Sequence, residues 1–315
     1  MAGGEASEDL SPALARVLPA IGGAEVVERL AALSGSDFTS VMLAVARKRA
    51  ARENPASVLR RYRSDRFVQP AAVQSARLRR AEELLAANLP SAFEMLTLSP
   101  LVPIGTHAVL GPLSQDKVVT AVRACEVAAD PTNGLALEAA VRRIGVRDAQ
   151  VRLAAFQRVV RAEPVRPGYF AHFSLLGLVT AGRDDGGHRF ECEAVAEHAR
   201  ALAAGLLATG PTAARFSRVQ LALTPLTPAG EALAGAVSGS LADAPLDVVL
   251  DENREAGRGY YRELCFKINV IAGAEWTEVG DGGFTDWTAR LTASARERLL
   301  ISGIGIDRVA ALMAQ

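Results

Sequence analysis

The chain has 315 residues, of which 50% are hydrophobic and 22% are charged, with 27 glycines and 15 prolines. This composition excludes intrinsic disorder and collagen-like structure, and it supplies enough apolar side chains for a sizeable buried core. The 35 Lys and Arg residues balance 35 Asp and Glu residues, and this net charge of zero argues against a surface built to bind nucleic acid or an anionic membrane.

Cysteine usage and the N-terminus predict where the protein resides. The three cysteines, Cys125, Cys192 and Cys265, lie far apart with no C-x-x-C pair, which argues against a disulfide framework and against a thiolate zinc site. The first ten residues are acidic and carry no apolar core, so we expect no signal peptide. No apolar run approaches the roughly 18 residues that a membrane-spanning helix needs. We therefore expect a soluble, cytoplasmic protein with no membrane partner.

The N-terminal part of the chain is predicted to be helical. Residues 14–33 and 36–54 carry apolar side chains at helical spacing. Pro55 follows a charged, arginine-rich stretch and interrupts the pattern. We predict a helical appendage over residues 1–55, of open function, and a larger domain over residues 56–315.

The larger domain mixes strands and helices at irregular spacing. A helix is predicted over residues 71–87, ending at Asn88 and Pro90. Further helices are predicted over 133–144, 192–208 and 287–296 and from 307 onward, and strand-like segments over 93–99, 152–163, 172–182, 218–226, 246–252, 259–272 and 299–306. This order is typical of an α+β domain with a mostly antiparallel sheet flanked by helices.

The C-terminal segment indicates a phosphate site. A predicted strand carries glycines at 303 and 305 and runs into a helix whose first turn holds Asp307 and Arg308. Glycines allow a ligand to approach the backbone closely, and the planar guanidinium of an arginine matches phosphate oxygens. The alternative interpretation is a tight strand–helix junction whose arginine lies on the surface.

A second segment carries Arg161 and Glu163, then a Pro/Gly-rich loop and Phe173. Side chains two residues apart on a strand point to the same face, so the cation and the carboxylate would face one ligand together. The alternative is an exposed strand face with a charge pair.

These segments resemble the sequence motifs of the class II aminoacyl-tRNA synthetases. The segment around Arg308 resembles motif 3, and the segment that begins at Arg161 resembles motif 2 in residue types and order. The predicted helix over 71–88, with the strand that ends at Pro100, resembles motif 1. Since motif 1 forms the two-fold interface of that family, the resemblance implies a homodimer.

The resemblance also implies an ATP site. By analogy with motif 2, Arg161 would bind the α-phosphate and the substrate carboxylate, Glu163 would read the adenine amino group, and Phe173 would stack on adenine. By analogy with motif 3, Arg308 would hold the γ-phosphate beside the glycine strand. Arg161 and Arg308 are therefore the candidate catalytic residues.

Magnesium normally accompanies ATP in this family. Three carboxylates near the glycine turn at 280–283 are open candidates for holding it, namely Glu278, Asp281 and Asp286. The residues alone do not discriminate among the three.

Finer features resemble the histidyl-tRNA synthetase branch, which includes the regulatory subunit of ATP phosphoribosyltransferase. Gly177 and Gly182 follow the motif 2 aromatic at the spacing of that branch, and Tyr260 and Tyr261 match its paired tyrosines. The substrate pocket implied by this resemblance comprises Asp130, Thr132, Leu175, Val179, Arg254, Arg258, Tyr260, Tyr261, Gly282, Gly283 and Phe284.

The sequence departs from the histidine enzymes where they hold their substrate. Leu175 and Val179 stand at the positions of a Gln and a Glu, and the activating Arg of the tyrosine signature falls on Ala256, between Arg254 and Arg258. A buried hydrogen-bonding group left unpaired costs about 1–3 kcal/mol, so these changes argue against histidine as the substrate. The chain also ends soon after motif 3, without room for the anticodon-binding domain of that branch, so ordinary tRNA charging is not expected.

Three function classes remain open. The first is an ATP-dependent, adenylate-forming ligase that activates an amino acid or another small carboxylic acid, with an unidentified acyl acceptor. The second is a catalytically silent regulatory or amino-acid-sensing subunit of a partner enzyme, which the lost substrate residues favour. A pure interaction scaffold, the third possibility, predicts no nucleotide binding.

Overall fold

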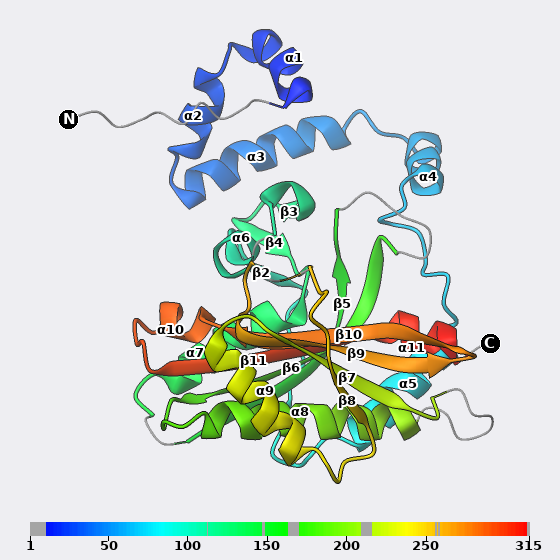
Figure 1. The fold of residues 1–315 in the computed structure, drawn as a ribbon. Helices are drawn as coiled ribbons and strands as arrows, with labels where there is room; N and C mark the ends of the chain where they lie inside the picture. Colours follow the sequence, from blue (N-terminus) through cyan, green and yellow to red (C-terminus); the bar gives the residue numbers. More distant parts are fainter. Residues whose placement is uncertain are drawn as a thin grey trace. The chain divides into compact units, whose positions relative to one another are not determined.

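The structure is a computed structural model that describes residues 11–111, 113–146, 149–162, 170–208, 216–255, 257 and 259–313 (Figure 1). The chain divides into two compact units. One comprises Met1–Arg61 with Ala121–Ala124, and the other comprises Tyr62–Thr120 with Cys125–Gln315. None of the described helices combines the length and the apolar character needed to cross a bilayer.

The first unit is helical, as expected. It holds α1 (Pro12–Ile21), α2 (Glu25–Ala31) and α3 (Gly35–Ala50), and α4 (Pro55–Ser64) follows across the boundary between the units. The hydroxyl of Ser11 accepts a hydrogen bond from the Leu14 amide, and that of Ser34 accepts one from the Asp37 amide, so both helices begin at a capping serine. Gly22, at φ 104°, ends α1 in the left-handed region.

An eight-stranded sheet forms the second unit, in the order β1-β5-β6-β11-β10-β9-β7-β8. Its strands are β1 (Glu94–Met95), β5 (Val151–Val160), β6 (His172–Arg183), β7 (Val219–Pro225), β8 (Asp247–Leu250), β9 (Arg262–Ala272), β10 (Glu275–Thr285) and β11 (Glu297–Gly305). The pairs β1–β5 and β7–β8 are parallel, and the other neighbours are antiparallel. The predicted α+β class with a mostly antiparallel sheet is therefore confirmed.

Helices and a small second sheet surround the main sheet (Figure 1). The helices are α5 (Ser75–Ala87), α6 (Thr106–Leu110), α7 (Pro131–Arg143), α8 (Arg189–Ala208), α9 (Pro228–Ser240), α10 (Trp287–Leu291) and α11 (Ile306–Leu312), with a 3₁₀ turn over Gln115–Lys117. The small sheet has the order β2 (Leu101–Pro103), β4 (Cys125–Val127), β3 (Thr120–Ala121).

Alternation along β6 defines the two faces of the sheet. Gly177 faces the first turn of α7, because a Cβ there would lie 2.8 Å from Cγ of Pro131. Three residues later, Thr180 faces α8 through a 2.9 Å hydrogen bond between its hydroxyl and Nε2 of His198. The strand is therefore covered by α7 on one face and by α8 on the other, and the missing side chain at 177 allows α7 to approach closely.

Several element boundaries differ from the prediction. The predicted strand over 259–272 begins only at Arg262; Tyr260 lies in a turn, and Tyr261 lies between that turn and the strand. The predicted helix over 287–296 ends at Leu291 and is followed by Ala293 at φ 51°. Apolar residues occur in both turns, so hydropathy alone extends each element too far.

Candidate functional site

A cavity of about 530 Å³ lies where β6, β10 and β11 meet the first turn of α7. Ten of the residues predicted from the sequence line it: Asp130, Thr132, Arg161, Phe173, Leu175, Tyr260, Tyr261, Gly303, Gly305 and Arg308. The predicted residues of this set, separated by up to 178 positions along the chain from Asp130 to Arg308, thus share one concave surface. A cavity of this size is in the range of small-molecule sites.

Arg161 follows the end of β5 and reaches across to the segment before α7. Its Nε donates to the carbonyl of Ala129 at 2.9 Å, and its Nη2 donates to Oδ2 of Asp130 at 3.0 Å. Its guanidinium carbon also lies 5.3 Å from the ring centroid of Phe173. Two consecutive residues and an aromatic ring therefore define the position of this cation at the cavity wall.

Asp130 is also the N-cap of α7. Its Oδ1 accepts the amide of Thr132 at 2.9 Å and the hydroxyl of the same residue at 2.7 Å, while Oδ2 accepts Arg161. Pro131 occupies the first helical position, where its missing amide hydrogen costs nothing. The start of α7, whose backbone dipole favours anions, thus lines the cavity.

Arg308 enters the same cavity from α11, on the far side of the glycine strand. Its Nη1 donates to the carbonyl of Glu278 at 2.8 Å. A Cβ at Gly303 would have its nearest neighbour, the Leu176 carbonyl oxygen, at 3.4 Å, and one at Gly305 would have none closer than 3.6 Å. A side chain at either position would therefore meet only ordinary van der Waals contacts, and both glycines line the cavity, where their lack of a side chain favours close approach of a ligand.

Next to Arg308, a buried aspartate was missed by the sequence reasoning as a site element. Asp307 is 1% exposed and accepts the amide of Ser174 at 2.6 Å and Nη2 of Arg158 at 3.1 Å. These bonds join the first turn of α11 to β5 and β6 and so hold the helix that carries Arg308. The sequence shows Asp307 beside Arg308, but Arg158 is 149 residues away from it and carries no local signal.

A buried histidine–glutamate pair was also missed. His107 is 1% exposed, lines the cavity, and places Nδ1 2.5 Å from Oε1 of Glu126, which is fully buried. The other ring nitrogen, Nε2, accepts the amide of Ala129 at 2.9 Å. Burial opposes ionisation of Glu126, but the hydrogen bonds from His107, Gln115 and Gly105 outweigh it and lower the pKa of this carboxyl.

The paired tyrosines form the aromatic wall of the cavity. Their ring centroids lie 4.1 Å apart, and the ring of Tyr260 also stacks on Trp287 at 6.4 Å. The hydroxyl of Tyr261 donates to Asp281 at 3.2 Å, and the same carboxylate accepts Nη2 of the buried Arg254 at 2.9 Å. Burial and then the Asp281 charge raise the pKa of both phenols, which therefore stay protonated.

Five predicted pocket residues do not line the cavity. Val179 is fully buried beneath α7, and Phe284 lies in the core on the opposite face of the sheet, since it is an odd number of residues from the cavity-facing Asp281. Gly282 and Gly283 serve packing, because a Cβ would lie 2.6 Å from the Ile301 carbonyl oxygen or 2.5 Å from Cδ1 of Tyr261, respectively. Arg254 does not line the cavity but contacts two residues that do, since it pairs with Asp281 at 2.9 Å and its guanidinium carbon lies 5.5 Å from the ring centroid of Tyr261.

Two further predicted residues, Glu163 and Arg258, lie outside the described residues, as does Ala256. Of the three magnesium candidates, Glu278 and Asp281 line the cavity, whereas Asp286 does not and instead accepts Nη2 of Arg262 at 2.9 Å. The cationic groups, the glycines of β11 and the two acidic residues at the cavity are chemically suited to an ATP–magnesium complex.

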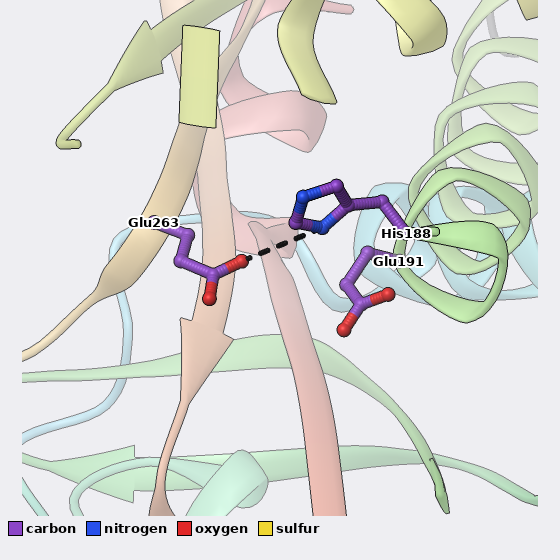
Figure 2. A group of neighbouring side chains, drawn as sticks. All are labelled: His188, Glu191 and Glu263. Carbon is purple, nitrogen blue, oxygen red and sulfur yellow. Dashed lines mark ion pairs between the residues drawn. The ribbon is translucent and has the colours of Figure 1, made fainter. Parts of the chain in front are cut away.

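One group outside the cavity has donor atoms spaced for a metal ion among the described residues. Figure 2 shows His188, before α8, with Glu191 of α8 and Glu263 of β9; their ligand atoms lie within 4.8 Å of one another. The Nδ1 of His188 is 3.9 Å from Oε2 of Glu263, and Glu191 already accepts Nε of Arg298 at 3.1 Å. Because the buried carboxylate is neutralised by an arginine, we treat this group as an ion-pair cluster.

The fold is that of class II aminoacyl-tRNA synthetase cores. An apo histidyl-tRNA synthetase from S. aureus matches with a TM-score of 0.61 at 12% identity, over 79% of this chain and 73% of that chain. A Bacillus halodurans protein described as an ATP phosphoribosyltransferase regulatory subunit/histidyl-tRNA synthetase matches with a TM-score of 0.58 at 14% identity, over 78% and 83%.

A histidine–tRNA ligase subunit from Alicyclobacillus acidocaldarius matches with a TM-score of 0.57 at 16% identity, over 78% of this chain and 97% of that chain. No family model and no curated protein matches the sequence. The predicted resemblance to the histidyl-tRNA synthetase and regulatory-subunit branch is thus confirmed for the fold, at low sequence identity, and the chain has a class II synthetase-like core.

Proposed function

We propose that the chain is an ATP-dependent, adenylate-forming ligase that activates an amino acid or another small carboxylic acid. The observation that carries the proposal is that Arg161 and Arg308 line one cavity together with Gly303 and Gly305 of β11. Two guanidinium groups in one partly enclosed site favour a polyanion with several phosphates over a single small anion.

In the proposed reaction, Arg161 binds the α-phosphate and the carboxylate of the acid, and Arg308 binds the γ-phosphate. Phe173 stacks on adenine, and Glu163 is proposed from the motif to accept its amino group. A carboxylate oxygen attacks the α-phosphorus, and the bond from that phosphorus to the bridging oxygen breaks, which yields an acyl-adenylate and pyrophosphate. Since the acid is already ionised, no general base is needed, and positioning and charge neutralisation provide the rate enhancement.

Magnesium would neutralise phosphate charge and orient the pyrophosphate leaving group. The proposed ligands on this chain are Glu278 and Asp281, both of which line the cavity; the carboxylate of Glu278 also lies 3.9 Å from Nζ of Lys267. Asp281 already accepts Arg254 and Tyr261, and this arrangement fixes the orientation of its carboxylate.

The cavity wall supports an acid of low polarity. Leu175, Tyr260, Tyr261, Trp287 and Ile301 line it with apolar and aromatic surface. Leu175 stands where the histidine enzymes carry a Gln, so the cavity offers no equivalent hydrogen bond to an imidazole. We therefore propose that the acid is not histidine.

The second candidate is a regulatory or amino-acid-sensing subunit, and one observation favours it. Arg161 is paired with Asp130, so a phosphate or carboxylate must compete with a side chain of this chain for the guanidinium. A regulatory-subunit description is also attached to one of the structures with this fold. In both candidates we propose a cytoplasmic homodimer with a catalytic-core domain over residues 56–315.

ATP–pyrophosphate exchange, screened against amino acids and other carboxylic acids, tests the proposal. The ligase predicts acid-dependent exchange that is lost in Arg161→Met and in Arg308→Met. If the protein binds ATP or an amino acid but none of the acids tested supports ATP–pyrophosphate exchange, the result favours the regulatory or amino-acid-sensing subunit instead. Absence of nucleotide and amino-acid binding refutes both.

A further inference from the structure

We propose that His107 and Glu126 form a positioning pair that sets the orientation of Arg161 through the backbone of Ala129. The expected effect on nucleotide binding rests on the proposed function. The positioning of Arg161 itself rests on a chain of hydrogen bonds within the protein. Neither residue has a counterpart among the sequence motifs described above.

The first link is the carboxylate of Glu126, which is saturated with donors. Its Oε1 accepts the amide of His107 at 3.0 Å as well as the ring Nδ1, and its Oε2 accepts the amide of Gly105 at 3.0 Å and Nε2 of Gln115 at 2.9 Å. A fully buried carboxylate with four donors is held in one orientation, because any rotation leaves a donor unpaired. Glu126 therefore provides a fixed acceptor for the histidine ring.

The second link is the tautomer of His107. Since Nε2 accepts the backbone amide of Ala129, it carries no proton, and the proton of the neutral ring must lie on Nδ1, which donates to Glu126. A neutral imidazole that donates on one side and accepts on the other can join a carboxylate to a backbone amide. The pair thus fixes the amide of Ala129 in space.

The third link joins this backbone to Arg161. The carbonyl of Ala129 accepts Nε of Arg161, and the carboxylate of the next residue, Asp130, accepts Nη2. The dipeptide 129–130 is therefore held by the histidine through its amide and holds the guanidinium through its carbonyl and side chain. Displacement of Ala129 moves both acceptors of Arg161 at once.

Removal of the imidazole breaks this chain. In His107→Leu, the Ala129 amide loses its acceptor and the buried Glu126 loses a donor. The hydrogen bond from the Ala129 amide then no longer fixes the position of residues 129–130. In His107→Gln, an amide side chain can still accept from one group and donate to another. The inference predicts that the glutamine variant retains part of the function that the leucine variant loses.

The structural content can be tested by NMR without any ligand. The Nε–Hε resonance of Arg161, assigned by its loss in Arg161→Lys, should exchange slowly with water in the wild type because it donates to a carbonyl. In His107→Leu and in Glu126→Gln this exchange should accelerate by roughly tenfold or more, and His107→Gln should lie between. The matched control is His198→Gln, which alters a buried histidine that contacts Thr180 and Ser302 instead. This variant should leave the exchange rate of the Arg161 Nε–Hε group unchanged.

Unchanged exchange of the Arg161 resonance in both folded variants of the pair would overturn the inference, whether or not ATP binds. The functional consequence is measured by ATP titration in a double-mutant cycle. His107→Leu should weaken ATP binding by roughly tenfold in the wild type and by less than about twofold in Arg161→Met. Equal losses in both backgrounds would also refute the positioning role, whereas failure of the wild type to bind ATP would refute the proposed function alone.

Discussion

Replacing His198 with glutamine is expected to remove a pH-dependent part of the folding stability. His198 lies on α8, is fully buried, and contacts the hydroxyls of Thr180 and Ser302 at 2.9 Å and 2.8 Å. Burial, with a smaller effect of the Arg152 charge, lowers the pKa of His198 to about 3. In the unfolded chain the ring titrates near 6.5, so between these values the unfolded state binds a proton that the folded state excludes.

The sign and the size of the pH effect on stability follow from this difference between the folded-state and unfolded-state pKa values of His198. Stability is fully present above about pH 6.5 and falls as the pH decreases towards 3, by about 1.4 kcal/mol per pH unit, which amounts to about 2 kcal/mol at pH 5. The His198→Gln variant keeps hydrogen-bonding capacity in the buried site but cannot titrate. The stability advantage of the wild type over the variant should therefore shrink by about 2 kcal/mol between pH 7.5 and pH 5.

Urea unfolding of both proteins at the two pH values measures this difference directly. His188→Gln, which changes a half-exposed histidine, controls for the loss of a histidine as such. A wild-type advantage that is the same at pH 7.5 and pH 5 would refute the burial argument, since it would mean that the ring charges equally well in the folded protein.

Other predictions concern glycines, an ion pair and assembly. Gly283→Ala should lower the thermal unfolding midpoint because its Cβ would overlap an aromatic ring, whereas Gly303→Ala should fold normally and weaken ATP binding in a titration. Glu297→Gln should cost about 3 kcal/mol in urea unfolding, because it leaves the buried guanidinium of Arg143 beside a neutral partner; a cost below about 1 kcal/mol would contradict this. In sizing experiments the protein should be a dimer that weakens when Pro100 is altered, and a wild-type monomer would contradict the motif 1 assignment.

Motif spacing was most successful at identifying cavity residues that lie close to one another in the sequence. Arg161 and Phe173 lie 12 residues apart in the sequence, and Arg308 lies three residues after Gly305, so short-range patterns marked all three, and all three line one cavity. Their roles remain proposals. The α+β class was also predictable from the sequence, because the apolar residues of β5, β6 and α8 show clear strand and helix periodicities.

Tertiary packing decided what the sequence did not show. Val179 shares a face of β6 with Leu175, but α7 covers Val179, whereas Leu175 lines the cavity. The hydropathy of a sequence does not indicate how far a helix extends over a strand. The His107–Glu126 pair joins two short elements 19 residues apart and has no periodic or motif signal. Phe284 was predictable as a core residue from alternation relative to Asp281, but the motif resemblance led to the wrong face.

Titrations of adenosine, AMP, ADP and ATP into the wild type, Arg161→Met and Arg308→Met show whether the two guanidinium groups bind different phosphates of one nucleotide. The account predicts that the wild type binds ATP most tightly, that Arg308→Met loses the preference for ATP over ADP, and that Arg161→Met loses the preference for AMP over adenosine. Each loss should be about 10- to 100-fold, as for a charge-assisted hydrogen bond. Wild-type affinities that do not depend on phosphate number, or variants that keep both preferences, would contradict it.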